Sequence, residues 1–184
     1  MTRSRVVVIG LGTGLRRDDG IGPLVASFIA EWRIPQVSAE VSEGEPTQLM
    51  DLWTGVDLAV VVDATVCEPA SPGRVLHIDT ARLRRAPAAG CSHCLGLAET
   101  VALAEALGRN PGRLVLVGVE AACLGTGFGL SPPVASAIPA VIEAVLADIA
   151  RCVHLRDTSG RFREPLFFVA RLPHSSKFSV GSLA

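Results

Sequence analysis

Apolar residues occur along the chain in two patterns, as short runs and as longer stretches with helical spacing. Short β-branched runs are typical of strands, and recurrence every three to four residues is typical of an amphipathic helix. Because the two kinds of segment alternate, we expect an α/β fold, a three-layer α/β/α sandwich with a mostly parallel central sheet of about five strands. The predicted strands are residues 5–9, 37–41, 57–65, 73–79 and 113–121, and the predicted helices are 21–32, 47–53, 95–108 and 132–153.

Two of the predicted strands differ in how deeply they should be buried. The run at 57–65 is continuously apolar up to Asp63, which is typical of a central strand covered on both faces. The run at 73–79 alternates apolar and polar residues, so we expect a more exposed strand there, and it is the candidate for an antiparallel neighbour.

The chain is expected to contain one domain followed by a tail. A sequence of 184 residues is long enough for one sizeable core, and residues 1–154 are predicted to form it. Residues 155–184 are rich in Arg, Ser, Pro and Phe without sustained periodicity, so we expect a C-terminal tail there.

Composition limits which classes of partner, and which cellular compartment, we expect for the protein. The formal net charge of −1 and the pI near 6.4 give no reason to expect nucleic acid. No apolar run reaches the roughly 18 to 20 residues that span a bilayer, so membrane insertion is not expected. The odd number of cysteines, 5, suits a reducing compartment with free thiols, and we expect a cytoplasmic protein.

A glycine turn opens the chain in the segment "VVVIGLGTGLRRDDGIG", residues 6–22. A strand that leads through Gly-x-Gly into a helix is how dinucleotide-binding units begin, but Leu15 stands where the third glycine belongs. Asp18 and Asp19 would repel a pyrophosphate and attract a cation. Arg16 and Arg17 beside them form a basic spot, whose explanation is either a solvated surface or contact with an acidic peptide or its carboxylate.

Three residues in different segments are candidates for a shared site. Asp19 follows the first strand, Asp63 ends the central strand, and His93 precedes a predicted helix. Ligands of parallel α/β proteins bind at the carboxyl ends of the strands, where two carboxylates and an imidazole would make a partial site for nickel or zinc. Helix capping is the alternative for one acid of the first pair, and we assign that structural role to Asp18. Asp63 could instead be a hydrogen-bonded strand end, and His93 an incidental loop residue.

The segment "CSHC" places Cys91 and Cys94 in a C-x-x-C around His93. A zinc ribbon would need a second pair of ligands at matching spacing, and the other cysteines are scattered singly. A thiol redox site of the thioredoxin kind would follow the first strand of a βαβ unit, whereas this one lies deep in the chain. Neither alternative is favoured, although metal-assisted thiol oxidation stays open.

Four segments resemble the hydrogenase maturation proteases, which remove a C-terminal extension from the large subunit of nickel-iron hydrogenases. The resemblance covers about residues 5–150. The segments are "VVVIGLGTGLRRDDGIG" (6–22), "VVVDAT" (60–65), "SHCLGLAE" (92–99) and "LVGVEAACLGTGFGLSPPVASAIP" (116–139).

The resemblance implies which residues carry the activity. Asp19, Asp63 and His93 fall on the positions regarded in the family as the metal-binding and catalytic set. It also implies that the nickel is supplied by the substrate and borrowed transiently, so that no permanent cofactor is expected. The expected function is therefore an endopeptidase without a Ser or Cys nucleophile, whose partner is the large-subunit precursor.

The family's substrate-binding segment, "DGGT", corresponds here to "SEGEPT" (42–47), which keeps Gly44 and Thr47 as the expected substrate-binding residues. Thr13 stands where the family usually has asparagine. Two alternative functions follow from these departures, a nickel or precursor chaperone that binds without cutting and a related endopeptidase of the germination-protease type with another substrate. A dinucleotide-binding module is the remaining alternative.

Overall fold

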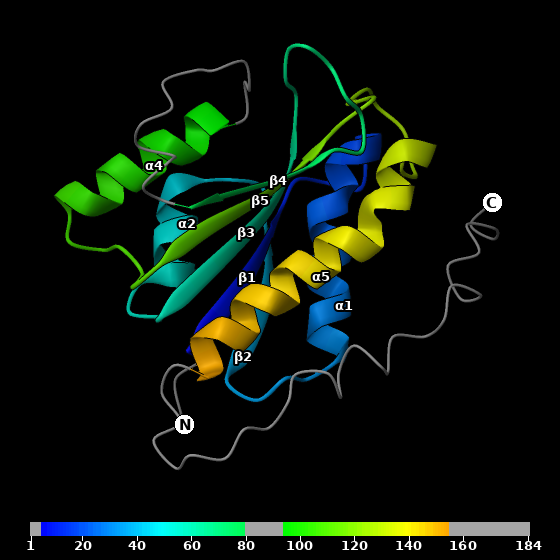
Figure 1. The fold of residues 1–184 in the computed structure, drawn as a ribbon. Coiled ribbons are helices and arrows are strands. Elements are labelled where there is room, and N and C mark those ends of the chain that lie inside the picture. Colours follow the sequence, from blue (N-terminus) through cyan, green and yellow to red (C-terminus); the bar gives the residue numbers. More distant parts are fainter. Residues whose placement is uncertain (1–4, 80–93, 155–184) are drawn as a thin grey trace.

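The computed structural model describes residues 5–79 and 94–154. Its sheet has five strands in the order β2-β1-β3-β5-β4, with β4 antiparallel to β5 and the other pairs parallel (Figure 1). The predicted sandwich and the antiparallel neighbour are both confirmed. The strands are β1 (Val6–Leu11), β2 (Val37–Ser42), β3 (Leu58–Thr65), β4 (Val75–Asp79) and β5 (Leu114–Glu120).

Helices cover both faces of the sheet. The pair α1 and α5 packs on one face, and the pair α2 and α4 packs on the other (Figure 1). A short 3-10 helix, η1, which the sequence pattern did not predict, leads into α1. The bounds are η1 (Arg17–Gly20), α1 (Ile21–Glu31), α2 (Pro46–Trp53), α4 (Cys94–Ala106) and α5 (Pro132–His154).

The position of β3 in the centre of the sheet explains why its sequence is continuously apolar. All of its residues are buried, because helices cover both of its faces. Val60 and Val62 belong to the core beneath α1 and α5, while Ala59 and Val61 belong to the core beneath α2 and α4. The predicted tail, residues 155–184, lies outside the described residues, so the expected domain boundary stays a prediction.

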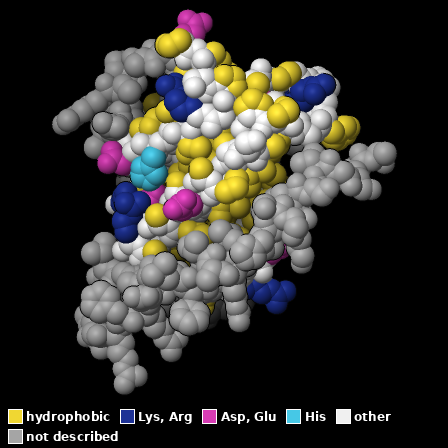
Figure 2. Space-filling model, turned by 45° about the vertical axis from the view of Figure 1, so that its right-hand side comes forward, with side chains coloured by type: hydrophobic (Ala, Val, Ile, Leu, Met, Phe, Trp, Pro, Cys, Tyr) yellow, Lys and Arg dark blue, Asp and Glu magenta, His cyan; other side chains and the backbone are white. Residues whose placement is uncertain are grey.

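Helix α5 is long and apolar enough, by length and composition, to cross a membrane, with a mean hydropathy of 1.6. Here its wholly buried Val134, Val141 and Val145 pack on the sheet, so the protein core accounts for this apolar character. The face turned forward in Figure 2 shows hydrophobic side chains at its surface between charged groups.

The start of α1 approaches β1 with no side chain between the two backbones. A Cβ atom on Gly10 would lie 2.1 Å from the carbonyl oxygen of Gly22, and one on Gly22 would lie 2.2 Å from that of Leu11 and 2.6 Å from that of Val62. Only glycine fits at both positions. This close packing places η1 directly above the ends of β1 and β3.

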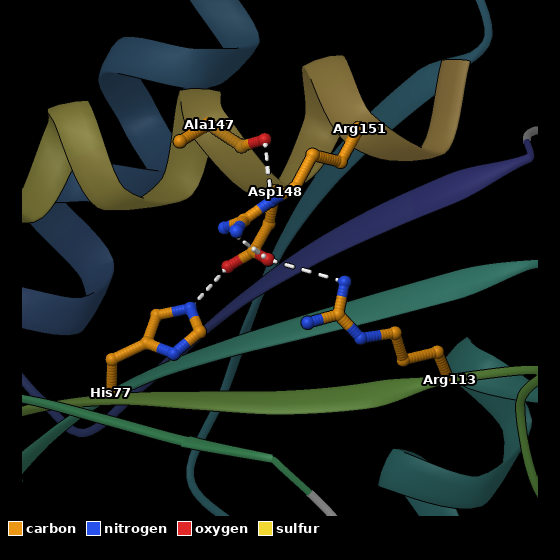
Figure 3. A network of polar contacts seen from close by, with 5 residues as sticks. All are labelled: His77, Arg113, Ala147, Asp148 and Arg151. Carbon is orange, nitrogen blue, oxygen red and sulfur yellow. Dashed lines mark hydrogen bonds and ion pairs between the residues drawn. The ribbon is translucent and has the colours of Figure 1, made fainter. Parts of the chain in front are cut away.

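A buried acid joins α5 to the far edge of the sheet. The Asp148 side chain has no exposed surface, and its carboxylate contacts His77 Nε2 at 2.6 Å, Arg151 Nη2 at 2.9 Å and Arg113 Nη1 at 3.3 Å (Figure 3). His77 belongs to β4 and Arg113 directly precedes β5, so one carboxylate connects three elements. Such a charge is stable in the interior because it is paired and hydrogen-bonded.

We expect Asp148→Ala to lower the free energy of unfolding by about 2–4 kcal/mol, because three charged contacts and a packed side chain disappear together. Arg151→Ala is the matched control and should cost about 1 kcal/mol or less, since the Arg151 side chain is 57% exposed. Urea denaturation measures both values. Equal losses in the two variants would show that Asp148 does not organise this contact.

Candidate active site

The structure brings together two of the three acids and bases that the sequence singles out. β1 and β3 are parallel neighbours with Gly10 opposite Val62, so both strands end at the same edge of the sheet. Asp63 follows at the end of β3, and η1 carries Asp19 above it. The two carboxyl groups are close enough for the charge of Asp19 to affect the ionisation of Asp63. His93 lies outside the described residues.

The turn between β1 and η1 encloses Asp19. The backbone N–H of Thr13 donates a hydrogen bond of 2.9 Å to Asp19 Oδ2. Gly12 has a φ of +110°, and a Cβ atom there would lie 2.2 Å from the carbonyl oxygen of Asp19, so glycine is required. Asp19 is 5% exposed, which means that its carboxylate is held in one place rather than free in solvent.

Asp63 is a carboxyl group whose charged form is disfavoured. Burial raises its pKa, the charge of Asp19 raises it further, and the hydrogen bond from the backbone of Ala64 opposes both, with a resulting pKa of about 7. Near neutral pH the group therefore holds a proton for about half of the time. A divalent cation between the two acids would stabilise the charged form of Asp63 and displace the proton.

The donor set around this pair is incomplete in the part of the chain that the structure describes. No Lys or Arg among residues 5–79 and 94–154 forms an ion pair with Asp19 or Asp63. The same residues contain no cluster of three His, Cys, Asp or Glu side chains. Two neighbouring carboxylates without a cationic partner fit a metal ion by their chemistry, with coordination positions left for ligands from elsewhere.

Asp18 has the structural role expected of it, but by a different interaction. Neither η1 nor α1 has a side-chain cap, so the predicted helix capping by Asp18 is wrong. Its carboxylate accepts hydrogen bonds from the backbone N–H groups of Ala122, Cys123 and Ser131 and from the Ser131 hydroxyl. Burial alone would raise the pKa of Asp18, but these hydrogen bonds outweigh it and lower the pKa. The side chain thus joins η1 to the loop before α5.

A cavity of about 520 Å³ adjoins the turn that holds Asp19. Its wall is polar and apolar in similar measure and includes two carboxylates, Glu43 and Glu45, and the amide of Gln48, none of which is a predicted site residue. The altered "SEGEPT" segment, which contains both glutamates, was the signal that could have indicated them. The lining residues are Gly12, Thr13, Gly14, Pro23, Val41, Ser42, Glu43, Glu45 and Gln48.

The two expected substrate-binding residues shape this cavity without lining it. Gly44 has a φ of +91°, and its N–H donates to Ser42 Oγ at 3.1 Å. The Thr47 hydroxyl donates to Glu45 Oε1 at 2.7 Å in the first turn of α2. Glu45 also accepts from the N–H of Gln48, so it caps α2.

One cysteine contradicts the expectation that the thiols are free. Cys67, which is buried just beyond β3, is disulfide-bonded, whereas the exposed Cys123 has a free thiol. An odd count shows only that at least one thiol is unpaired, and it does not exclude a bond between two of the others. Cys91 lies outside the described residues, and Cys94 begins α4.

We expect Asp63→Asn to stabilise the metal-free protein at pH 8 by about 2–4 kcal/mol. Since the pKa of Asp63 is raised from 3.8 to about 7 by folding, the folded state binds the proton more tightly, and stability falls as pH rises through this interval. Urea denaturation at pH 5 and pH 8 should show a smaller pH dependence in the variant than in the parent. Asp51→Asn, at a site 69% exposed, should leave the parent's dependence unchanged. A variant less stable than the parent at pH 8 would contradict the assignment.

We expect Asp18→Ala to lower the free energy of unfolding by about 3 kcal/mol or more, because four donors lose a charged acceptor in the protein interior. Thermal and urea unfolding measure the loss. Asp51→Ala, which removes an exposed ion pair with Arg109, is the control and should cost about 1 kcal/mol or less. A loss for Asp18→Ala no larger than this would mean that solvent replaces the carboxylate.

Comparison with known proteins connects this site to a family. The family model for hydrogenase maturation proteases matches residues 44–148. Hydrogenase 2 maturation protease of Escherichia coli K12 is 29% identical over 149 residues, which are 78% of this chain and 89% of that protein. The structure of the hydrogenase maturating endopeptidase HybD of E. coli aligns with a TM-score of 0.65 at 27% identity, over 80% of this chain and 93% of that one.

A second solved structure, an endopeptidase from E. coli in solution, aligns with a TM-score of 0.69 at 26% identity, also over 80% of this chain and 93% of that one. Fold and sequence therefore agree over the region that contains β1 to α5. Since the family model covers more than half of the 184 residues, the chain belongs to the hydrogenase maturation proteases and is a peptidase.

Proposed function

We propose that this peptidase removes the C-terminal extension of a nickel-iron hydrogenase large-subunit precursor after nickel has been inserted. The observation that carries the proposal is the pair of buried acids, Asp19 and Asp63, at the end of β1 and β3. Burial and the charge of Asp19 raise the pKa of Asp63 to about 7, and a cation bound between the two acids would stabilise their charged forms. Family membership supports the choice of substrate.

In this proposal the precursor brings the nickel ion as part of the substrate. Asp19, Asp63 and His93 would hold it, and two oxygens with one imidazole nitrogen are ligands that suit nickel. The bound ion would supply Lewis-acid polarisation of the scissile carbonyl or of a water molecule. Because the ion leaves with the processed subunit, the protease needs no resident cofactor, and cleavage reports that the precursor is loaded.

The chain's own residues contribute position and proton transfer. Asp19 is fixed by the N–H of Thr13, so it presents one carboxylate oxygen in a constant direction. Asp63, with its pKa near 7, is suited to accept or release a proton at neutral pH if it acts as a base instead of a ligand. Both roles need the same buried position, which is why the sequence pattern alone leaves them open.

The cavity beside Asp19 would receive the peptide next to the cleaved bond. Its depth is set by the turn at Gly44 and by the cap of α2, in which Thr47 takes part. The substrate-binding role of Gly44 and Thr47 is thus proposed as one of shape, with Glu43 and Gln48 providing the polar contacts. A cytoplasmic location, expected from the composition, stays a prediction.

We expect Asp63→Asn and His93→Ala to slow cleavage of a nickel-loaded precursor by about 10²-fold or more, because each removes a ligand or a proton-transfer group. Mass spectrometry of the precursor over time measures the shorter product. Asp51→Asn is the control acid and should cleave at the parent's rate, and precursor without nickel should stay intact. Normal cleavage by both variants would reject the assignment of Asp63 and His93 to the site. If the parent protein bound the precursor but released no shorter product, the chaperone function would be favoured.

A further inference from the structure

Two loops beside the candidate active site are joined into one rigid edge. The N–H of Gly127 donates to the carbonyl of Leu15 at 2.9 Å, and the N–H of Arg17 donates to the carbonyl of Gly127 at 2.9 Å. Asp18 adds its hydrogen bonds to Ala122, Cys123 and Ser131 from the same side. We call the exposed side chains of this edge, Leu15, Arg16, Arg17 and Phe128, the lip.

The lip exposes apolar side chains that its rigid backbone cannot turn inward. Phe128 is 80% exposed and Leu15 is 58% exposed. The Leu15 carbonyl accepts one of the hydrogen bonds between the loops, and Phe128 directly follows Gly127, which takes part in both. A large aromatic side chain held in solvent on an ordered loop gains free energy when a partner covers it. Exposed apolar groups of this kind gather where proteins bind one another.

The charge of the lip is also unmatched. Among the eight described arginines, five form ion pairs with carboxylates, whereas Arg16, Arg17 and the distant Arg33 form none. The side chain of Arg17 lies across Gly127, where a Cβ atom would come 3.1 Å from its Nε. An arginine held in this way presents its guanidinium in a set direction, and its fork of N–H groups matches a carboxylate.

The lip is continuous with the candidate site. Arg17 opens the same 3-10 helix that carries Asp19. The preceding residues of this loop, Gly12 to Gly14, line the cavity, so the loop has the cavity on one side and the lip on the other. A peptide that crosses above Asp19 from the cavity would therefore reach the lip next.

We propose that the lip binds the part of the precursor that follows the cleaved bond, through a segment that combines apolar side chains with a carboxylate. This inference rests on the proposed function, because it takes the precursor as the partner. Apolar contact with Phe128 and Leu15 would provide affinity, and pairing with Arg16 and Arg17 would set direction. The cleaved segment would then be recognised before the bond is cut.

Calorimetric binding tests the lip separately from catalysis. In an Asp63→Asn background, which prevents processing, we expect Phe128→Ala to weaken binding of the nickel-loaded precursor about tenfold. Arg16→Glu should weaken it roughly fivefold, with a larger effect at low salt. Both sites are exposed, so folding should be unaffected. Leu107→Ala, at a site 57% exposed, and Arg33→Glu are the matched controls and should bind like the parent.

A second probe, the mature large subunit without its extension, identifies which part of the precursor is bound. The Asp63→Asn protein should bind the mature subunit more weakly than it binds the precursor. The lip substitutions in that background should leave the affinity for the mature subunit unchanged. The proposal would be overturned if the lip substitutions left the affinity for the precursor unchanged. It would also be overturned if they lowered the affinity for the mature subunit as much as the affinity for the precursor. Precursor that binds through the lip but is never cut by the parent would reject the proposed function and leave the lip standing.

Discussion

The candidate site depends on the absence of side chains where α1 meets the sheet. Gly22 lies against the carbonyl oxygens of Leu11 and Val62, so the start of α1 touches both β1 and β3 through backbone alone. A methyl group at this point would push η1 outward by more than the packing of a protein interior accommodates. The distance between Asp19 on η1 and Asp63 on β3 is therefore set by two glycines that carry no chemistry of their own.

Once these carboxyl groups are held close, the distribution of hydrogen-bond donors decides their chemistry. Asp18 and Asp19 are adjacent in the sequence, yet Asp18 takes four donors from the loop before α5 and Asp19 takes one from Thr13. A carboxylate with several donors is stable as an anion in the interior. Asp63 is buried beside a second acid and has only one backbone donor, so its anion is disfavoured. Its pKa is therefore raised to about 7. A buried carboxyl group with such a raised pKa is typical of a functional site.

The sequence predicted what depends on short-range pattern and missed what depends on distant partners. The continuous run of β3, the alternating β4 and the helical repeats all correspond to observed elements, because burial on one or two faces dictates those periods. The structural role assigned to Asp18 is confirmed, but the capping interaction predicted for it was wrong, since the true donors lie more than 100 positions away. The contact between His77 and Asp148 was missed for the same reason. At the candidate site, Asp19 and Asp63 could be placed together from strand order, whereas the cavity could not be found, because its wall depends on side-chain directions in the β2–α2 loop.

Two groups of buried acids in this fold differ in whether their charge is matched by a basic side chain. Asp148 lies at one edge among His77, Arg113 and Arg151, so its charge is fully matched within the described chain. Asp63 on the central strand β3 and Asp19 above it form no ion pair with a described Lys or Arg, although Arg16 and Arg17 belong to the same loop as Asp19. The Arg17 side chain lies against Gly127 instead of pairing with Asp19, although pairing opposite charges would be favourable electrostatically. In our proposal the position between the two acids receives the nickel ion of the substrate, and the two arginines receive a carboxylate of the precursor.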